Sequence, residues 1–101
     1  MIRVRFATTK LEKAYNTLSE GTKRWGEASA RKFIERVNAL QAVDSVAEFA
    51  TAFPQYRDHA LKGDKGNLRA FTLHDRWRVE YEPDSDGKGV TIREVSKHYG
   101  D

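Results

Sequence analysis

Two alternating segments separated by only two residues constrain the fold of this chain more than any other feature. The segments are NLRAFTL (67–73) and RWRVEYE (76–82), and both alternate side chains in the manner of β-strands. His74 and Asp75 lie between them, and both residue types tolerate the positive φ that a tight turn requires. We therefore expect an antiparallel hairpin that turns at these two residues.

This pairing would divide the side chains between two faces. One face would carry Leu68, Ala70, Thr72, Trp77, Val79 and Tyr81, a set apolar enough to receive helices. The other would carry Arg69, Phe71, Leu73, Arg76, Arg78 and Glu80. On that second face, Arg78 opposite Phe71 would form a platform for a phosphate and an unpaired base. The alternative is that Arg69 and Glu80 form an ordinary cross-strand ion pair and Arg78 only covers Phe71.

Amphipathic segments precede the hairpin. IRVRF (2–6) alternates apolar and basic residues and is predicted to be a strand, and a helix should follow, capped by Thr9 and Glu12 and ended by Gly21. A second helix is expected from about 24 to 40. It would bury Ala30, Phe33, Ile34, Val37 and Leu40 and expose Arg31, Lys32, Glu35 and Arg36. A short extra helix near 45–53 would be capped by Asp44 or Ser45 and closed by Pro54.

VTIREVSK (90–97) is the last predicted strand. Val90 and Ile92 would share a face, and Val95 would join them only if a bulge lies near Glu94. The order strand, helix, helix and three strands predicts an α+β fold, with a helical hairpin packed on one face of a small antiparallel sheet. The opposite face would stay open, and a functional site could lie there.

Size and composition limit the possible classes of protein. One hundred and one residues form a single domain, 1–101, because they cannot enclose two cores. The chain has no cysteine, which excludes a disulfide framework, an iron–sulfur cluster and a thiolate zinc site and fits a reducing cytoplasm. The opening MIRVRFATTK carries charges within its only apolar run, unlike a signal peptide, and no apolar stretch predicts a membrane span.

The segment RDHALKGDKGNLRAF (57–71) concentrates basic residues just before the hairpin. Residues 55–78 contain six Lys or Arg against three Asp, whereas the whole chain has a net charge of +3. A basic patch of this kind can attract phosphate, and Gly63 and Gly66 would let the backbone approach one closely. Charge alone fits a solvated turn equally well.

The segment HALKGDKGNLRAFTLHDRWRVEYE (59–82), followed by a last strand that ends in KHYGD (97–101), resembles the RelE/ParE superfamily of bacterial toxins from type II toxin–antitoxin pairs. Within it, the nearest likeness is to HigB-like toxins. A His-x-x-Lys-Gly element, a second strand that begins with Trp-Arg, and a C-terminal His and Tyr match in order and spacing. The resemblance covers essentially the whole chain, and the superfamily has the predicted order of elements.

The resemblance implies one of two activities. RelE and HigB toxins are ribosome-dependent endoribonucleases that cut mRNA, whereas ParE toxins act on DNA gyrase and lack the nuclease residues. The catalytic residues of HigB-like nucleases correspond here to His59, Lys62, Arg78, His98 and Tyr99. Further candidate RNA contacts are Arg57, Lys65, Arg69, Phe71, Arg76 and Lys97. The order Lys97-His98-Tyr99 departs from the acid–Tyr–His order that is common in HigB-like chains, so either His98 or Tyr99 could take the terminal role.

These residue types suit cleavage of RNA without a metal or another cofactor. Attack of a 2′-OH on the adjacent phosphorus needs a base, an acid for the departing 5′-oxygen, and cations around the phosphorane. Imidazole groups such as His59 and His98 can take either proton-transfer role. Arg78 and Lys62 would supply fixed positive charge, and Tyr99 could stack on a base or orient a phosphate.

The expected partners follow from the same resemblance. They are a cognate antitoxin, which could lie against the helices or over the open face, and the ribosome with its mRNA. Operator DNA would be bound only through the antitoxin, and no membrane is expected. Two alternatives stay open: a ParE-type toxin without catalysis, and an inactive homologue that acts as antitoxin partner or co-repressor. The retained histidines disfavour the ParE reading, because a binder needs no proton carrier.

Overall fold

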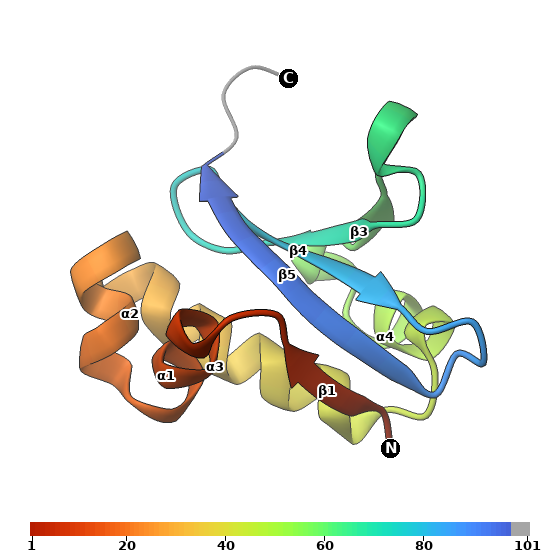
Figure 1. Cartoon of the computed structure of the whole chain (residues 1–101), viewed down its shortest axis with the longest axis horizontal. Coiled ribbons are helices and arrows are strands. Elements are labelled where there is room, and N and C mark those ends of the chain that lie inside the picture. The colour runs from red at the N-terminus through yellow and green to blue at the C-terminus, as the bar shows by residue number, and fades with distance from the viewer. Residues whose placement is uncertain (98–101) are drawn as a thin grey trace.

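A computed structural model describes residues 1–97 of the chain (Figure 1). The elements are β1 (Arg3–Phe6), α1 (Thr9–Asn16), α2 (Leu18–Trp25), α3 (Glu27–Ala42), α4 (Val46–Ala52), η1 (Pro54–Tyr56), β2 (His59–Ala60), η2 (Gly63–Lys65), β3 (Arg69–Thr72), β4 (Trp77–Pro83) and β5 (Gly89–Lys97). The strands form one sheet in the order β1-β5-β4-β3-β2. Helices α1–α3 lie on one side of it, and the loop with η2 projects away from them (Figure 1).

The predicted α+β class is confirmed, but two features of the sheet differ from the prediction. The sheet is mixed, because β1 runs parallel to β5, whereas the other neighbouring strands are antiparallel. The helices carry the chain from β1 across one face, so the last strand returns beside β1 in the same direction. A two-residue strand, β2, also extends the opposite edge by pairing with β3.

The first predicted helix is two helices. Thr8, and not Thr9, caps α1 by accepting a hydrogen bond from the Leu11 N–H at 3.2 Å. Thr17 then has extended backbone (φ −139°), which separates α1 from α2. Gly26, with φ 84°, makes the turn into α3. The prediction that Gly21 ends a helix is wrong, because Gly21 lies buried inside α2.

Gly21 lies at the close contact between α2 and α3. A Cβ atom on this residue would lie 3.0 Å from the Ala30 Cβ and 3.3 Å from the Trp25 ring. The missing side chain therefore allows α2 to pack tightly against α3, which explains a glycine in a helix interior despite its low helix propensity.

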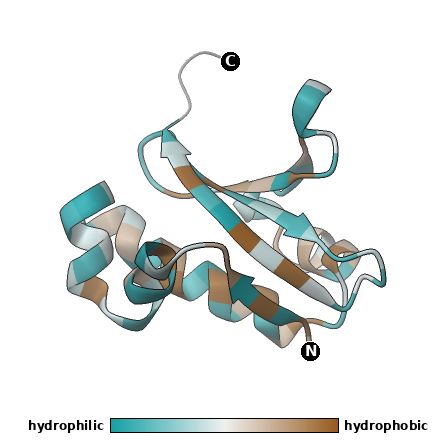
Figure 2. Ribbon diagram, viewed as in Figure 1, coloured by the Kyte–Doolittle hydropathy of each residue, from teal (hydrophilic) through white to brown (hydrophobic). Residues whose placement is uncertain are grey.

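The core lies between the helices and one face of the sheet, and Figure 2 shows apolar and polar residues alternating along β5. Phe49 of α4 is fully buried in this core, and its ring centroid lies 5.5 Å from that of Phe71. The predicted apolar stripe of α3 is confirmed for Ala30, Phe33, Val37 and Leu40, whereas Ile34 is half-buried.

Arg36 was predicted to be exposed, and that prediction is wrong. Its side chain is buried and its guanidinium carbon lies 4.3 Å from the centroid of the Tyr56 ring. The guanidinium also donates to the Thr72 carbonyl oxygen. This cation therefore joins α3 to η1 and to the end of β3, a contact that helical periodicity does not reveal.

The β3–β4 hairpin forms as predicted but in a different register. Leu73 and Trp77 close the turn through a 2.7 Å hydrogen bond from the Leu73 N–H to the Trp77 carbonyl, so three residues, 74–76, form the connection. Asp75 and Arg76 both have positive φ, 52° and 68°. One extra turn residue shifts the pairing by one, which exchanges the faces of one strand relative to the other.

The register corrects the predicted faces of β3. Phe71 pairs with Val79 and Arg69 pairs with Tyr81, so these four side chains point toward the helices. Ala70 pairs with Glu80 and Thr72 with Arg78, so the opposite face carries these instead. The faces predicted for β4 are right, and those predicted for β3 are inverted.

The bulge considered for the last strand is present. Glu80 pairs with Glu94, but the next residue, Tyr81, pairs with Ile92, so Arg93 is the extra residue on β5. The bulge brings Val95, opposite Val79, onto the same face as Ile92. Within residues 1–97, no helix combines the length and apolarity needed to cross a membrane.

Substitution of Gly21 by valine should lower the free energy of unfolding by about 1–3 kcal/mol, because the branched side chain would force α2 away from α3. Chemical denaturation measures this change. The matched control is S19V on the exposed side of α2, which should change stability by less than about 0.5 kcal/mol. Equal effects of the two substitutions would contradict the close-packing role of Gly21.

Candidate functional site on the open face of the sheet

The face of the sheet opposite the helices brings together residues from four strands. His59 of β2 pairs with Ala70, Ala70 with Glu80, and Glu80 with Glu94, so these residues form one row across the sheet. Paired residues point to the same face. In the next row Arg78 lies between Thr72 and Ser96. We call this surface, with the loop 62–68 beside it, the open face.

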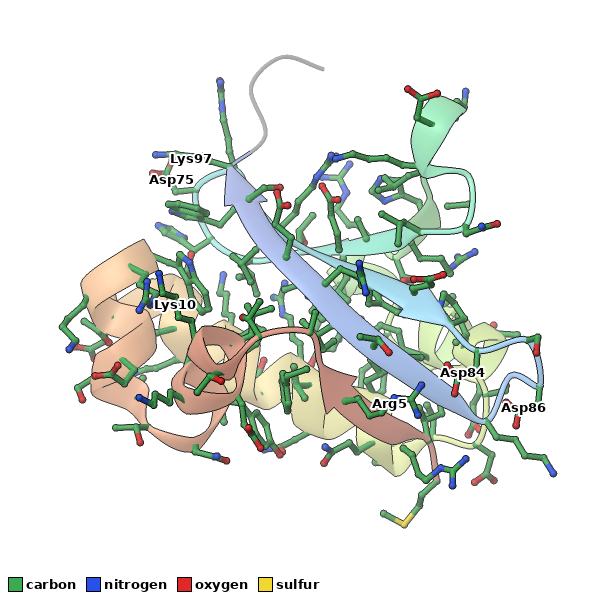
Figure 3. The ribbon with its side chains drawn as sticks, in the orientation of Figure 1. Arg5, Lys10, Asp75, Asp84, Asp86 and Lys97 are labelled. Atoms are coloured by element: carbon green, nitrogen blue, oxygen red, sulfur yellow. The ribbon has the colours of Figure 1, made fainter. Side chains whose placement is uncertain are left out.

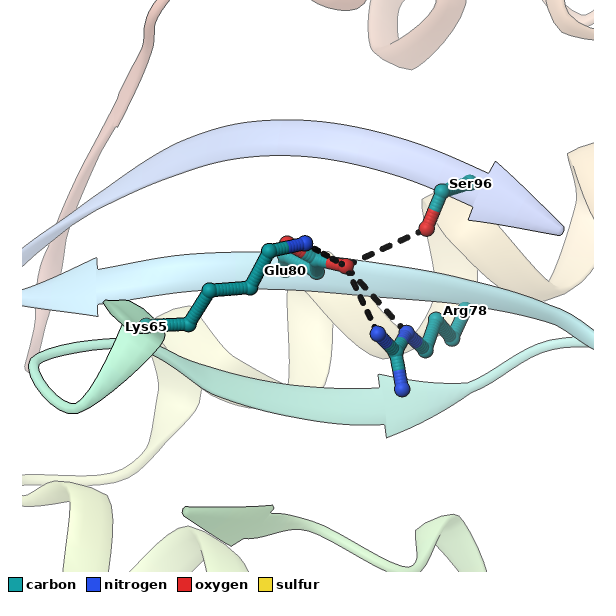
Figure 4. Close-up of polar contacts among 4 residues, drawn as sticks. All are labelled: Lys65, Arg78, Glu80 and Ser96. Carbon is teal, nitrogen blue, oxygen red and sulfur yellow. Dashed lines mark hydrogen bonds and ion pairs between the residues drawn. The ribbon is translucent and has the colours of Figure 1, made fainter. Parts of the chain in front are cut away.

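Glu80 is the centre of a polar cluster on the open face (Figure 4). Its side chain is only 2% exposed, and both carboxylate oxygens accept hydrogen bonds from the Lys65 ammonium, at 3.1 and 3.3 Å. Oε2 also accepts from Arg78 Nε at 3.2 Å, from Arg78 Nη2 at 3.0 Å, and from the Ser96 hydroxyl at 3.2 Å. Two cations and one hydroxyl therefore share a single buried carboxylate.

The electrostatics of the cluster keep Glu80 ionised. Burial on its own would raise the pKa of the Glu80 carboxyl, but hydrogen bonds and charge from Lys65 and Arg78 outweigh burial and lower that pKa below its ordinary value of 4.5. With both cations charged, Lys65, Arg78 and Glu80 together carry a charge of +1. The open face is therefore less positive than the sequence of the basic segment suggests.

Arg78 projects from the central strand with part of its guanidinium free. The side chain is 18% exposed, and Nε and Nη2 are bound to Glu80. Within residues 1–97, Nη1 has no hydrogen-bond partner, and Figure 4 shows it pointing away from the carboxylate. The free end of a guanidinium can still bind a phosphate.

His59 is exposed at the edge of the sheet, on the open face. Its Nδ1 lies 2.9 Å from the carbonyl oxygen of Arg57. A carbonyl only accepts, so Nδ1 carries the proton in this contact, and Nε2 of the neutral ring is the acceptor nitrogen, without a partner among residues 1–97. Arg57 adopts the left-handed conformation (φ 60°), which turns the chain so that its carbonyl meets the ring.

The loop after His59 lies beside the cluster. Lys62 is exposed at the start of η2, and Lys65 at its end reaches across to Glu80. An open groove of about 460 Å³ separates residues 63–68 from Glu82 and Arg93 on the sheet. Lys65 of the basic segment therefore lies on the open face, bound to Glu80.

Two predicted RNA contacts are placed elsewhere by the corrected register. Phe71 is fully buried against Phe49 and Tyr81, so the expected base platform of Phe71 and Arg78 does not exist. Arg69 faces the helices and donates to Asp58 through Nε at 2.9 Å and Nη2 at 2.7 Å. The alternative Arg69–Glu80 ion pair is also wrong.

The remaining predicted residues lie around the hairpin and beyond it. Arg76 is exposed in the turn. Lys97, at the end of β5, lies 3.6 Å from Asp75 and 5.6 Å from the centre of the Trp77 ring, and Figure 3 shows it beside Asp75. His98 and Tyr99 lie outside the described residues.

Asp58 is an important residue that the sequence analysis missed. Its side chain is fully buried and accepts hydrogen bonds from Arg69 and from the Tyr81 hydroxyl. Burial and the Asp58 carboxylate raise the pKa of Tyr81, and for Arg69 the effect of Asp58 outweighs burial and raises that pKa also. Asp58 therefore fixes the chain directly before His59. Its signal in the sequence was an acid directly before His59 in a segment rich in basic residues.

Comparison with known proteins agrees with this geometry at the level of the fold. Neither a protein-family model nor a curated protein matches the sequence. The YoeB/ParE toxin from Agrobacterium tumefaciens is similar in structure, with a TM-score of 0.58 and 16% identity over 97% of this chain and 100% of that chain. A conserved hypothetical protein from Helicobacter pylori has a TM-score of 0.57 and 17% identity, over 97% of this chain and 96% of that one.

These similarities define the class of fold. The chain has the fold of a YoeB/ParE toxin, in agreement with the resemblance of its sequence to the RelE/ParE superfamily. Identities of 16% and 17% establish the fold alone. The HigB-like subtype stays a prediction.

The Glu80→Gln variant should lose less stability in acid than the unmodified protein. The folded-state pKa of Glu80 is lowered, so its ionised form stabilises the fold above the ordinary value of 4.5, and this contribution disappears as the pH falls through the folded pKa. Glutamine cannot titrate. We therefore expect E80Q to be less stable near neutral pH, but its free energy of unfolding should fall less steeply as the pH is lowered. Denaturant unfolding from pH ~7 to ~3 measures this acid limb of the stability curve. Parallel acid limbs would contradict the ion-pair description of Glu80.

Proposed function

We propose that this protein is the toxin of a type II toxin–antitoxin system and that it inhibits translation by cutting mRNA on the ribosome. The observation that carries the proposal is the open face itself. Among residues 1–97, the Nε2 of His59 and one end of the Arg78 guanidinium have no hydrogen-bond partner, and the exposed Lys62 belongs to the same surface. This set matches the nuclease residues that the sequence resemblance indicates. The YoeB/ParE fold supports the same class of protein.

The proposed reaction is a transesterification within the RNA. The 2′-oxygen attacks the adjacent phosphorus, the bond from phosphorus to the 5′-oxygen breaks, and a 2′,3′-cyclic phosphate remains. A base accepts the proton of the 2′-OH, and an acid gives a proton to the departing 5′-oxygen. Nε2 of His59 is suited to one of these two transfers.

The positive groups of the open face would stabilise the transition state. Negative charge grows on the non-bridging oxygens as the phosphorane forms, so cations fixed near them lower the barrier more than they tighten substrate binding. The free end of Arg78 and the Lys62 ammonium are the groups for this role. Arg57, Lys65, Arg76 and Lys97 are proposed to hold the RNA backbone, and His98 and Tyr99 to supply the second proton transfer and orientation.

The partners belong to the same proposal. A cognate antitoxin would neutralise the toxin in the cytoplasm, and the complex would bind operator DNA through the antitoxin. The ribosome and its mRNA would be the targets of the free toxin. No membrane partner is expected.

One observation favours the ParE-type alternative, a toxin that inhibits DNA gyrase without catalysis. Lys65, a predicted RNA contact, and Arg78, a predicted catalytic residue, are both bound to Glu80. The open face therefore has less free positive charge than an RNA-binding surface usually presents. A face whose positive charge is partly neutralised fits a protein partner as well.

Short expression in bacteria, with primer extension across abundant transcripts, tests the nuclease proposal. We expect growth arrest and new 5′ ends in frame with codons. H59A should reduce cleavage by about 10²–10⁴-fold through loss of proton transfer, and R78A by about 10²–10³-fold through loss of transition-state charge. The matched control R24A, on the exposed surface of α2, should cleave normally. Full cleavage by folded R78A would contradict the assignment of this site.

Labelling of DNA and protein synthesis in the same cells separates the alternatives. Translation should collapse before replication if the nuclease proposal is right, because mRNA is the target. Early arrest of DNA synthesis with intact transcripts would favour the gyrase-directed alternative. Normal growth on expression of folded protein would favour an inactive homologue that serves as antitoxin partner or co-repressor.

A further inference from the structure

We propose that Glu80 is a positioning residue: it orients the Arg78 guanidinium toward the phosphate of the substrate and ties the loop of Lys62 and Lys65 to the same place. This inference rests on the proposed function, since it names a role within that site. The sequence resemblance assigns no role to this position. The contacts of Glu80 on the open face support this role (Figure 4).

The contacts of Arg78 define which part of its guanidinium is available. A guanidinium has five N–H groups, one on Nε and two on each terminal nitrogen. Glu80 Oε2 takes one from Nε and one from Nη2. The remaining N–H groups, on Nη1 and on the far side of Nη2, form the end-on fork that binds two phosphate oxygens. The carboxylate therefore fixes the guanidinium plane while leaving its binding edge free.

Glu80 also fixes the loop. Oε1 accepts from Lys65 at 3.1 Å, and Lys65 ends η2, the 3₁₀ turn that directly follows Lys62. The Ser96 hydroxyl donates to Oε2 and so restrains the carboxylate from β5, the strand beside β4. One carboxylate thus sets the positions of groups from the loop, β4 and β5.

Stability alone does not explain a carboxylate at this position. The side chain of Glu80 is 2% exposed between the buried residues Val79 and Tyr81. A buried ion pair contributes little net stability, because desolvation offsets the attraction, and an apolar residue of similar volume usually serves as well. Burying the Glu80 carboxylate costs desolvation, and its contacts occupy only one edge of the Arg78 guanidinium. Both features are typical of residues that hold a functional side chain in position.

Kinetics on ribosomes programmed with mRNA separate positioning from binding. E80Q raises the summed charge of Lys65, Arg78 and residue 80 from +1 to +2. We therefore expect KM to stay equal or fall, and the slope of log KM against log salt concentration to steepen by ~0.7. At the same time kcat should fall by roughly 10–100-fold, the loss expected for one charge-assisted hydrogen-bond pair. A merely structural role would reduce the active fraction and leave the kcat of the correctly folded enzyme unchanged, and that result would overturn the inference.

Glu94→Gln is the matched control. Glu94 pairs with Glu80 across the strands, lies on the same face and is exposed. E94Q adds the same charge to the open face without changing a contact to Arg78. It should therefore strengthen RNA binding slightly and leave kcat within about twofold. A fall in kcat equal to that of E80Q would show that charge, and not positioning, causes the effect.

A measurement on the folded protein keeps the inference testable apart from catalysis. In full-length protein labelled with ¹⁵N-arginine, the Arg78 Nε–H should exchange slowly with solvent in the unmodified chain and in E94Q, and at least tenfold faster in E80Q. Inorganic phosphate should shift the terminal guanidinium signals of Arg78 more weakly in E80Q. An unprotected Arg78 Nε–H in the unmodified protein would overturn the inference even if E80Q failed to fold.

The two proposals fail in distinguishable ways. If the unmodified protein cuts no RNA but Arg78 is protected and binds phosphate in a Glu80-dependent manner, the nuclease proposal is wrong and the positioning role stands. If RNA is cut and Arg78 is equally mobile with and without Glu80, the positioning role is wrong and the nuclease proposal stands.

Discussion

The three-residue connection between β3 and β4 sets the register on which both faces of the sheet depend. Because Asp75 and Arg76 take positive φ, Leu73 pairs with Trp77, and every following pair is determined. This register turns Phe71 into the core against Phe49 and leaves the small Ala70 beside Glu80 on the open face. A shift of β3 by one residue would turn Phe71 out of the core and put the small Ala70 in its place, so the core and the hairpin support each other.

Two buried carboxylates then organise the basic residues, one on each face. Asp58 holds Arg69 and the Tyr81 hydroxyl on the helix side, directly before His59. Glu80 holds Lys65 and Arg78 on the open side. Arginines that look equivalent in the sequence therefore have different environments. Arg69 is bound within the scaffold, whereas one edge of the Arg78 guanidinium has no partner in the part of the chain that the structure describes.

The proposed function depends on the residues of the open face and not on the fold. The similarity to the Agrobacterium tumefaciens toxin covers nearly the whole of both chains, but an identity of 16% establishes shared architecture only. The proposed nuclease chemistry depends on His59, Lys62 and Arg78 as a set. Its ParE-type rival depends on the partial neutralisation of that set by Glu80. The nuclease proposal and the ParE-type alternative thus both depend on how Glu80 binds these cations.

The sequence by itself determined the elements and their class. Alternation of period two and apolar stripes of helical spacing arise from local backbone geometry. The strands β1, β3, β4 and β5, the α3 stripe and the α+β class could therefore be predicted from them, whereas the two-residue β2 could not. The sequence also pointed to His59, Lys62 and Arg78, through the resemblance of their spacing to known toxins. Even the bulge on β5 was visible as a conflict between the positions of Ile92 and Val95.

Only the tertiary structure decided the register, the mixed sheet and the partners of the charges. The length of the turn depends on whether Arg76 adopts positive φ, and side-chain patterns do not encode that choice when both registers give a plausible apolar face. The burial of Arg36, the close packing at Gly21 and the pairing of Asp58 and Glu80 depend on contacts between residues distant in the chain. Such contacts exist only once the helices cover one face of the sheet. Packing then decides which charged side chains are buried, and a buried charge needs a partner of opposite charge.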